Sequence, residues 1–209
     1  MSFQHDYPDF ATYLADAMQH LGGLADESAA RIENAAALAS NQLVAGHKLV
    51  LLGTPGIAPL GELFCHGMLY SNADQRPALP AIAIQANASA LSANDSLRRE
   101  EDAHSDGADM RQFLRAAEAV ASAGDTLIVL SDQRLPALAQ ALENFYINRG
   151  VCSVLIAPDA LATTTSSPAH NIVISLECDT IASIQQVTLF ILNSLADMIE
   201  TRVFGDLNN

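Results

Sequence analysis

The residues best suited to chemistry lie in two short loops, each of which follows an apolar segment. Residues 53–56 read GTPG, and residues 131–134 read SDQR. Glycine and hydroxyl side chains between a strand and a helix can present hydrogen-bond donors to a phosphate. Neither loop matches a known nucleotide-binding fingerprint, Pro55 lacks an N–H group, and Asp132 repels anions unless Arg134 neutralises it. For the loops taken alone, tight strand-to-helix turns are therefore favoured, with Asp132 as a helix cap.

The residues that usually carry metal or thiol chemistry do not form a recognisable pattern. The three cysteines are widely separated and contain no C-x-x-C pair. The six histidines include no H-E-x-x-H motif and no i, i+4 pair on a predicted helix. We therefore expect no metal site, no cofactor and no disulfide framework. The cysteines are Cys65, Cys152 and Cys178.

Apolar segments and helical patterns alternate from residue 48 onward. The predicted strands are 48–52, 81–84, 126–130, 151–156 and 172–176. The predicted helices after the first strand are 60–69, 110–122, 136–148 and 180–204. Continuous apolar strands connected by helices are typical of a parallel sheet that is covered on both faces. We therefore predict a three-layer α/β fold with a five-stranded parallel sheet in flavodoxin-like order.

This strand order itself predicts where a ligand binds. Ligands of such sheets bind outside the carboxyl ends of the strands, at the point where the strand order reverses. In flavodoxin-like order that point lies between the first and third strands. Loops 53–56 and 131–134 are therefore the predicted site, and the charge-rich segment 96–109 is predicted to be a solvated loop near its mouth.

Two helices are predicted ahead of the sheet, at 9–21 and 24–44, with Gly22-Gly23 between them. We interpret residues 1–46 as a helical hairpin used in oligomerisation. Residues 47–209 then form the α/β core and the C-terminal helix of the same single domain. The apolar stripe on the helix 180–204 is wider than one sheet face needs, which favours assembly into a homo-oligomer.

Length and charge limit the number of domains, the classes of partner and the location that the chain can have. The chain has 209 residues, half of them hydrophobic, which suits one domain with a sizeable core. Ten Lys and Arg against 24 Asp and Glu give a net charge of -14, which opposes binding to nucleic acid or to anionic membranes. No apolar run reaches the ~20 residues of a membrane-spanning helix, and the N-terminus is unlike a signal peptide, so a cytoplasmic location is expected.

Several short motifs occur in the order and spacing of a known family. Residues 75–84 read QRPALPAIAI and match an R-P-x-x-P-A-I-A segment. Residues 93–95 (AND), 123–125 (AGD) and 184–185 (IQ) match further positions, as does the tail 193–204. By these motifs the chain resembles the sugar isomerase (SIS) domain family. Within it, the chain is similar to the group of phosphoheptose isomerase and the DnaA initiator-associating protein DiaA, and most similar to DiaA.

The chain departs from this family where the family carries its chemistry. The resemblance places the catalytic glutamate at Gly67 and the catalytic histidine at Thr188. Moving a proton between two sugar carbons needs an acid/base pair. The phosphate loops are degenerate as well, and the residues left to such a site are Gly53, Thr54, Gly56, Ser131 and Gln185. The resemblance therefore implies that the chain is not an enzyme and holds a phosphosugar only weakly.

The resemblance further implies a homotetramer that binds DnaA and promotes its assembly at the replication origin. Val203 and Phe204 match the hydrophobic pair implicated in contact with DnaA. Identical sites on one particle would raise the local concentration of the bound partner. Three alternatives stay open: a phosphosugar isomerase with a rearranged site, a phosphosugar-sensing module, and a structural SIS protein with another partner.

Overall fold

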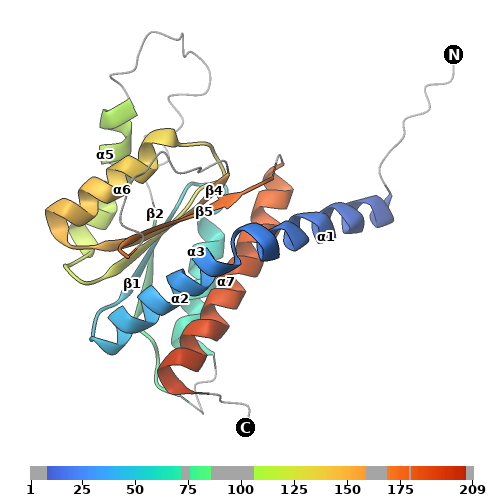
Figure 1. The fold of residues 1–209 in the computed structure, drawn as a ribbon. Helices are drawn as coiled ribbons and strands as arrows, with labels where there is room; N and C mark the ends of the chain where they lie inside the picture. The colour runs from blue at the N-terminus through green and yellow to red at the C-terminus, as the bar shows by residue number, and fades with distance from the viewer. Residues whose placement is uncertain (1–8, 72–75, 86–105, 159–168, 179, 206–209) are drawn as a thin grey trace, which may run out of the picture.

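A five-stranded parallel sheet forms the centre of the protein. The computed structural model describes residues 9–71, 76–85, 106–158, 169–178 and 180–205. The strand order is β2-β1-β3-β4-β5 (Figure 1). The strands are β1 (Leu49–Gly53), β2 (Ala81–Gln85), β3 (Thr126–Leu130), β4 (Cys152–Pro158) and β5 (Asn171–Leu176). The predicted α/β class and flavodoxin-like order are confirmed, and each strand lies within two residues of its predicted bounds.

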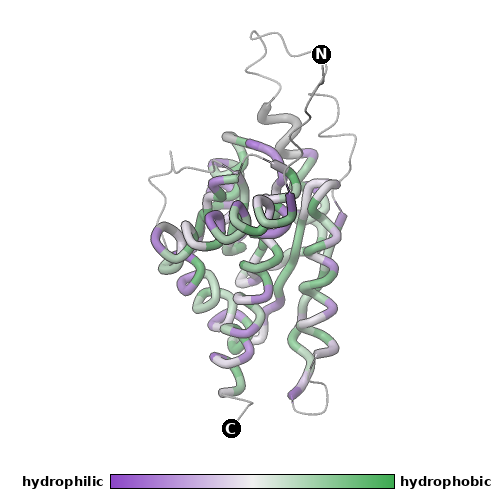
Figure 2. The backbone as a smooth tube through the Cα atoms, turned by 90° about the vertical axis from the view of Figure 1, so that its right-hand side faces the viewer, coloured by the Kyte–Doolittle hydropathy of each residue, from purple (hydrophilic) through white to green (hydrophobic). Residues whose placement is uncertain are grey.

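Helices cover both faces of this sheet. One face carries α5 and α6, and the other carries α2, α3 and α7 (Figure 1). The helices are α1 (Phe10–Glu27), α2 (Ala29–Val44), α3 (Ala58–Tyr70), α5 (Asp106–Val120), α6 (Pro136–Arg149) and α7 (Ile181–Phe204). Figure 2 shows hydrophobic and hydrophilic residues interleaved along the helices. No helix in the described part of the chain is long and apolar enough to cross a membrane.

Successive residues of each strand point to opposite faces and so enter two separate cores. Leu49 and Leu51 of β1 belong to the core beneath α2, α3 and α7. Val50 and Leu52 belong to the core beneath α5 and α6. All four are at most 1% exposed. Burial on both faces is the reason that the strand reads as a continuous apolar run rather than an alternating one.

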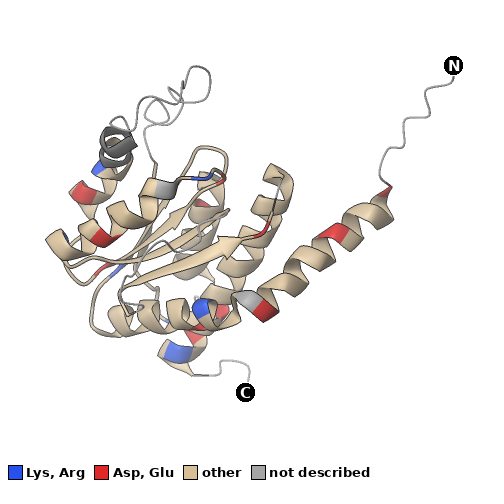
Figure 3. Ribbon diagram, turned by 45° about the horizontal axis from the view of Figure 1, so that its top comes forward, with Lys and Arg blue, Asp and Glu red and all other residues tan. Residues whose placement is uncertain are grey.

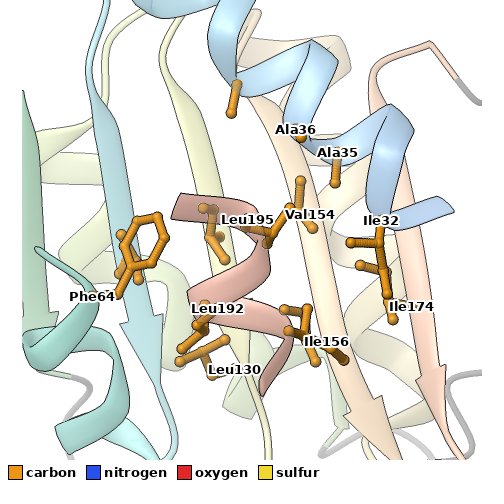
Figure 4. Packing of buried hydrophobic residues seen from close by; sticks show 14 of the residues in the cluster. Ile32, Ala35, Ala36, Phe64, Leu130, Val154, Ile156, Ile174, Leu192 and Leu195 are labelled. Atoms are coloured by element: carbon orange, nitrogen blue, oxygen red, sulfur yellow. The ribbon is translucent and has the colours of Figure 1, made fainter. Parts of the chain in front are cut away.

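Small residues let α2 approach the sheet and α7 closely. Ala35 and Ala36 of α2 are almost fully buried, as are Leu192 and Leu195 of α7. Figure 4 shows the two alanines close to Val154 of β4, with Leu195 beside it and Leu192 near Leu130. α7 begins after Thr180, whose hydroxyl accepts a hydrogen bond from the Ser183 N–H and caps the helix.

The first helix differs from its prediction. α1 runs through Gly22 and Gly23 to Glu27, and the break falls at Ser28. A helical glycine costs about 1 kcal/mol relative to alanine, which weakens a helix without ending it. Figures 1 and 3 show α1 continuing outward almost in line with α2, so the pair does not fold back as a hairpin. The oligomerisation role and the domain division stay predictions.

The start of α5 also differs from its prediction. The segment 96–109 was expected to be a loop, but α5 begins at Asp106, so its last four residues are helical. Phe113 and Ala117 of α5 are fully buried against the sheet. This packing stabilises the whole helix and overrides the weak helix propensity of its first turn. The rest of the segment lies outside the described residues, as does the 93–95 motif.

An aspartate joins the amino ends of β1 and β3. Asp125 accepts hydrogen bonds from the backbone N–H groups of Lys48 (3.0 Å) and Ser122 (2.7 Å) and forms an ion pair with the Lys48 ammonium. Burial by itself would raise the pKa of Asp125, but the hydrogen bonds and charge of Lys48 and the Ser122 N–H hold it below its usual value. We call this arrangement the amino-end clamp.

Candidate functional site

The two predicted loops lie side by side at the carboxyl edge of the sheet. β1 and β3 pair in parallel, with Gly53 opposite Leu130, so both loops start at the same level. The Thr54 N–H donates to the Leu130 carbonyl (3.0 Å) and joins the loops at their base. The structure therefore brings residues 53–56 and 131–134 together at the strand-order reversal.

A reciprocal pair of hydrogen bonds links the two loops. The Thr54 hydroxyl donates to Oδ1 of Asp132 (2.5 Å) and accepts from the Asp132 backbone N–H (3.1 Å). Thr54 is fully buried, whereas Asp132 is half-buried. We call this arrangement the carboxyl-end clasp. Asp132 was expected to cap the following helix, but no side-chain cap bond is found at α6, and its carboxylate reaches the first loop instead.

The carboxylate of Asp132 lies directly against Gly56. A Cβ atom added at Gly56 would stand 2.0 Å from Oδ2 of Asp132, far inside contact distance. Glycine at this position therefore lets the Asp132 carboxylate lie next to its Cα, and a larger residue would push the carboxylate aside. Gly53 has a different role, since a Cβ there would meet the Ala58 Cα at 2.7 Å. Gly53 lets α3 begin close to the end of β1.

Several hydrogen-bond donors in and next to the two loops are engaged locally. The N–H groups of Ile57 and Ala58 donate to the Thr54 carbonyl at 3.0 and 2.8 Å. In the second loop the Ser131 hydroxyl donates to the Gln133 carbonyl (2.8 Å) and accepts from the Gln133 N–H (3.1 Å). Ser131 is fully buried. These turns keep each loop compact and leave an incoming anion to compete with existing hydrogen bonds.

A third element reaches the same place from α7. Gln185 lies in the second turn of α7, and its Nε2 donates to the Gly56 carbonyl (2.9 Å). The two residues are 129 positions apart in the sequence. The structure therefore brings the five predicted site residues, namely Gly53, Thr54, Gly56, Ser131 and Gln185, to one edge of the sheet, and Thr54 and Gly56 contact the Asp132 carboxylate directly.

Sequence analysis missed a second carboxylate at this edge of the sheet. Glu62 of α3 accepts a hydrogen bond from Nε2 of Gln85, the last residue of β2 (3.1 Å). Glu62 is exposed, and His66 follows one turn later on α3 with its ring 4.9 Å from that of Tyr70. An i, i+4 spacing puts Glu62 and His66 on one face of the helix. The i, i+4 spacing of these two residues was the sequence pattern that could have indicated a polar face on this helix.

The two positions assigned to the family's catalytic pair lie elsewhere. Gly67 is half-buried on α3, and its carbonyl accepts from the Arg76 guanidinium (3.2 Å). Thr188 is fully buried in α7, and its hydroxyl has no hydrogen-bond partner among the described residues. Gly67 has no side chain that could transfer a proton, and the Thr188 hydroxyl is fully buried.

The predicted partner-binding pair lies at the end of α7. Val203 and Phe204 are half-buried and pack against the core. The Arg76 guanidinium lies 5.9 Å from the centre of the Phe204 ring and donates to Glu200. This cation–π contact and packing hold the Phe204 ring against the protein. Binding of DnaA through these residues stays a prediction.

Metal-ligating side chains do not gather in the described part of the chain, where no three of His, Cys, Asp and Glu lie close enough to hold an ion. All three cysteines are buried and none is in a disulfide. Burial, with a smaller contribution from Glu62, raises the pKa of Cys65 to about 12, so this side chain is a neutral thiol at neutral pH.

No family model matches the chain, but individual proteins do. A phosphoheptose isomerase from Halorhodospira halophila is 29% identical over 183 residues, which are 86% of this chain and 87% of the relative. A phosphoheptose isomerase from Methylococcus capsulatus is 26% identical over 200 residues, 94% and 95% of the two chains. The solved phosphoheptose isomerase of Francisella tularensis superposes with a TM-score of 0.70 at 20% identity, covering 91% of this chain and 96% of that one.

The chain has the SIS fold. Its sequence is similar to phosphoheptose isomerases along most of its length. The resemblance stated from short motifs is thus confirmed at the level of the SIS fold and of phosphoheptose isomerase. The closer similarity to DiaA stays a prediction.

The prediction that the chain is not an enzyme is wrong. The curated relatives, at 25 to 29% identity, are phosphoheptose isomerases, and nothing in the comparisons shows a loss of catalytic residues. The prediction rested on Gly67 and Thr188, two positions taken from short motifs. A shift of one residue along a helix turns a side chain by about 100°, so positions taken from short motifs do not establish that catalytic residues have been lost.

Proposed function

We propose that this SIS protein binds a sugar phosphate at the carboxyl edge of its sheet and isomerises it, as phosphoheptose isomerases are named for doing. One observation carries this proposal: the likeness to phosphoheptose isomerase extends over 94% of this chain and 95% of the relative. Similarity over whole chains includes every element that contributes to the edge. The strand-order reversal independently favours the same edge as the ligand site.

Isomerisation of a sugar needs a base that takes a proton from one carbon and returns it to the next. Glu62 is an exposed carboxylate at this edge, and its oxygen accepts a hydrogen bond from the exposed amide of Gln85. Asp132, in contrast, is half-buried, and its carboxylate accepts a hydrogen bond from the fully buried Thr54 hydroxyl and lies against Gly56. We therefore assign proton transfer to Glu62. Gln85 and Gln185 supply amide groups that can orient sugar hydroxyls.

The first experiment measures conversion of sedoheptulose 7-phosphate by the purified chain and by Glu62→Gln. We expect turnover in the unmodified protein and a loss of about 100-fold or more in Glu62→Gln, with a small change in KM. Glu33→Gln, which removes an exposed carboxylate on α2, is the matched control and should retain full activity. Absence of turnover in the folded, unmodified protein would contradict the proposal.

A second candidate function is the binding of DnaA by an assembly of several copies. The half-buried Phe204 at the end of α7 favours it, because an aromatic side chain with remaining exposure can anchor a partner. Calorimetry with the N-terminal domain of DnaA tests it, together with Phe204→Ala and Val203→Ala. We expect saturable binding that both substitutions weaken. No binding at high micromolar concentration, from protein shown to be tetrameric, would refute it.

A further inference from the structure

We propose that Asp132 occupies the anion position of the sugar-phosphate site and that a substrate phosphate has to displace its carboxylate. This inference rests on the proposed function, because it concerns the same edge of the sheet. It makes Asp132 the residue that sets how strongly this protein prefers or rejects a phosphorylated ligand.

The Asp132 carboxylate lies where a bound anion would be expected, which supports this inference. Oδ1 of Asp132 accepts a hydrogen bond from the Thr54 hydroxyl, and Oδ2 lies against Gly56. Both contacts are in the loop between β1 and the amino end of α3. That place is where small residues and a helix N-terminus favour an anion. The loop therefore already has a negatively charged group, which the chain itself provides.

The use of the donors supports it next. Thr54 is fully buried, and its hydroxyl can donate only one hydrogen bond. Asp132 accepts that hydrogen bond. The Asp132 N–H is engaged with the same hydroxyl oxygen. The Ser131 hydroxyl donates within its own turn. A phosphate oxygen can accept a hydrogen bond from the Thr54 hydroxyl only after the carboxylate has moved away.

Charge gives the direction of the effect. A phosphate dianion next to a carboxylate is a like-charge contact, which is destabilising wherever solvent is partly excluded. The chain as a whole has a net charge of -14, which adds to the unfavourable potential. The resting arrangement is therefore a low-affinity state for a phosphorylated sugar, and it leaves the affinity for an uncharged sugar unaffected.

The carboxylate is also free to move without a change in the fold. Asp132 is half-buried and follows the end of β3, so rotation of its side chain needs no shift of a strand. Its carboxylate accepts a hydrogen bond from a neutral hydroxyl, which is a weaker partner than a cation. Displacement by a ligand is consistent with both features.

The test is calorimetric titration of the protein, Asp132→Asn and Asp132→Ser with sedoheptulose 7-phosphate and with sedoheptulose. Asp132→Asn removes the charge and keeps the shape, and Asp132→Ser removes both. We expect both variants to bind the phosphorylated sugar about tenfold or more tightly than the unmodified protein, with no change for sedoheptulose. Asp197→Asn, an exposed position on α7, is the charge-matched control and should bind as the unmodified protein does.

The outcomes separate this inference from the proposed function. Equal or weaker binding by the Asp132 variants, with binding by the unmodified protein, overturns the inference and leaves the proposed function standing. Tight binding by the variants with none by the unmodified protein supports the inference and contradicts the proposed function. Absence of binding in every folded variant at millimolar concentrations overturns both. Thermal melting of each variant shows whether it is folded.

Discussion

The two ends of the β1–β3 pair each contain an aspartate, but the two aspartates differ in their surroundings. At the amino-end clamp, the Asp125 side chain is 3% exposed, forms an ion pair with the Lys48 ammonium and accepts hydrogen bonds from two backbone N–H groups. At the carboxyl-end clasp, Asp132 is half-buried and accepts a hydrogen bond from a neutral hydroxyl. A buried acid with a cation and several donors stabilises a fold, whereas a half-buried acid with a neutral partner can be exchanged for a ligand.

The largest effect expected from this comparison is on stability. Asp125→Ala leaves the N–H groups of Lys48 and Ser122 without their acceptor at a buried position. We expect the free energy of unfolding to fall by about 3 kcal/mol, as measured by urea denaturation. Asp132→Ala is the companion variant and should lower it by about 1 kcal/mol or less. Equal losses at the two positions would show that the two ends do not differ as described.

The second effect is a difference in pH dependence. The pKa of Asp125 is held below its usual, unfolded-state value in the folded protein, so its contribution to stability is fully present above that usual value. The contribution is lost as the pH falls through the lowered, folded-state pKa. We expect the stability difference between the unmodified protein and Asp125→Asn to be constant near pH 7 and to shrink below about pH 4. Unfolding curves measured across this range are the test, and a difference that grows on acidification would contradict it.

The smallest effect concerns the close contact at Gly56. A methyl group at this position would collide with the Asp132 carboxylate, 2.0 Å from its Oδ2. We expect Gly56→Ala to destabilise the protein by about 1–2 kcal/mol. The same substitution in an Asp132→Ser background should cost clearly less, because the carboxylate is then absent. Thermal unfolding of all four proteins measures this coupling, and additive losses would show that the two groups do not touch.

Sequence patterns predicted the sheet well because its signals are local and redundant. The run KLVLL and its counterparts are apolar in every position, which only a strand buried on both faces requires. The same patterns failed at Gly22-Gly23, where the surroundings rather than the glycines decide whether a helix continues. A Cβ atom added at either glycine would meet no other part of the described structure within 4 Å, so no close packing at these positions calls for glycine, and α1 continues through them.

The two loops were predicted to lie together and do so, whereas the contacts between them were not predicted, and ligand binding there stays a prediction. The reversal of strand order located the loops at Thr54 and Ser131 correctly. The Asp132 carboxylate was assigned to a helix cap, because an aspartate near the start of a helix commonly has that role. The Gln85–Glu62 contact escaped notice, because β2 and α3 meet only after the chain has folded.

The sequence by itself determined the α/β class, the five strands and their order. Apolar periodicity and right-handed crossovers act within a few tens of residues and leave few other topologies. Only the tertiary structure decided which groups meet at the carboxyl edge. Thr54 and Asp132 are 78 residues apart, and Gln185 and Gly56 are 129 apart. Contacts at such separations depend on the rotation and spacing of packed elements, and local patterns do not specify either.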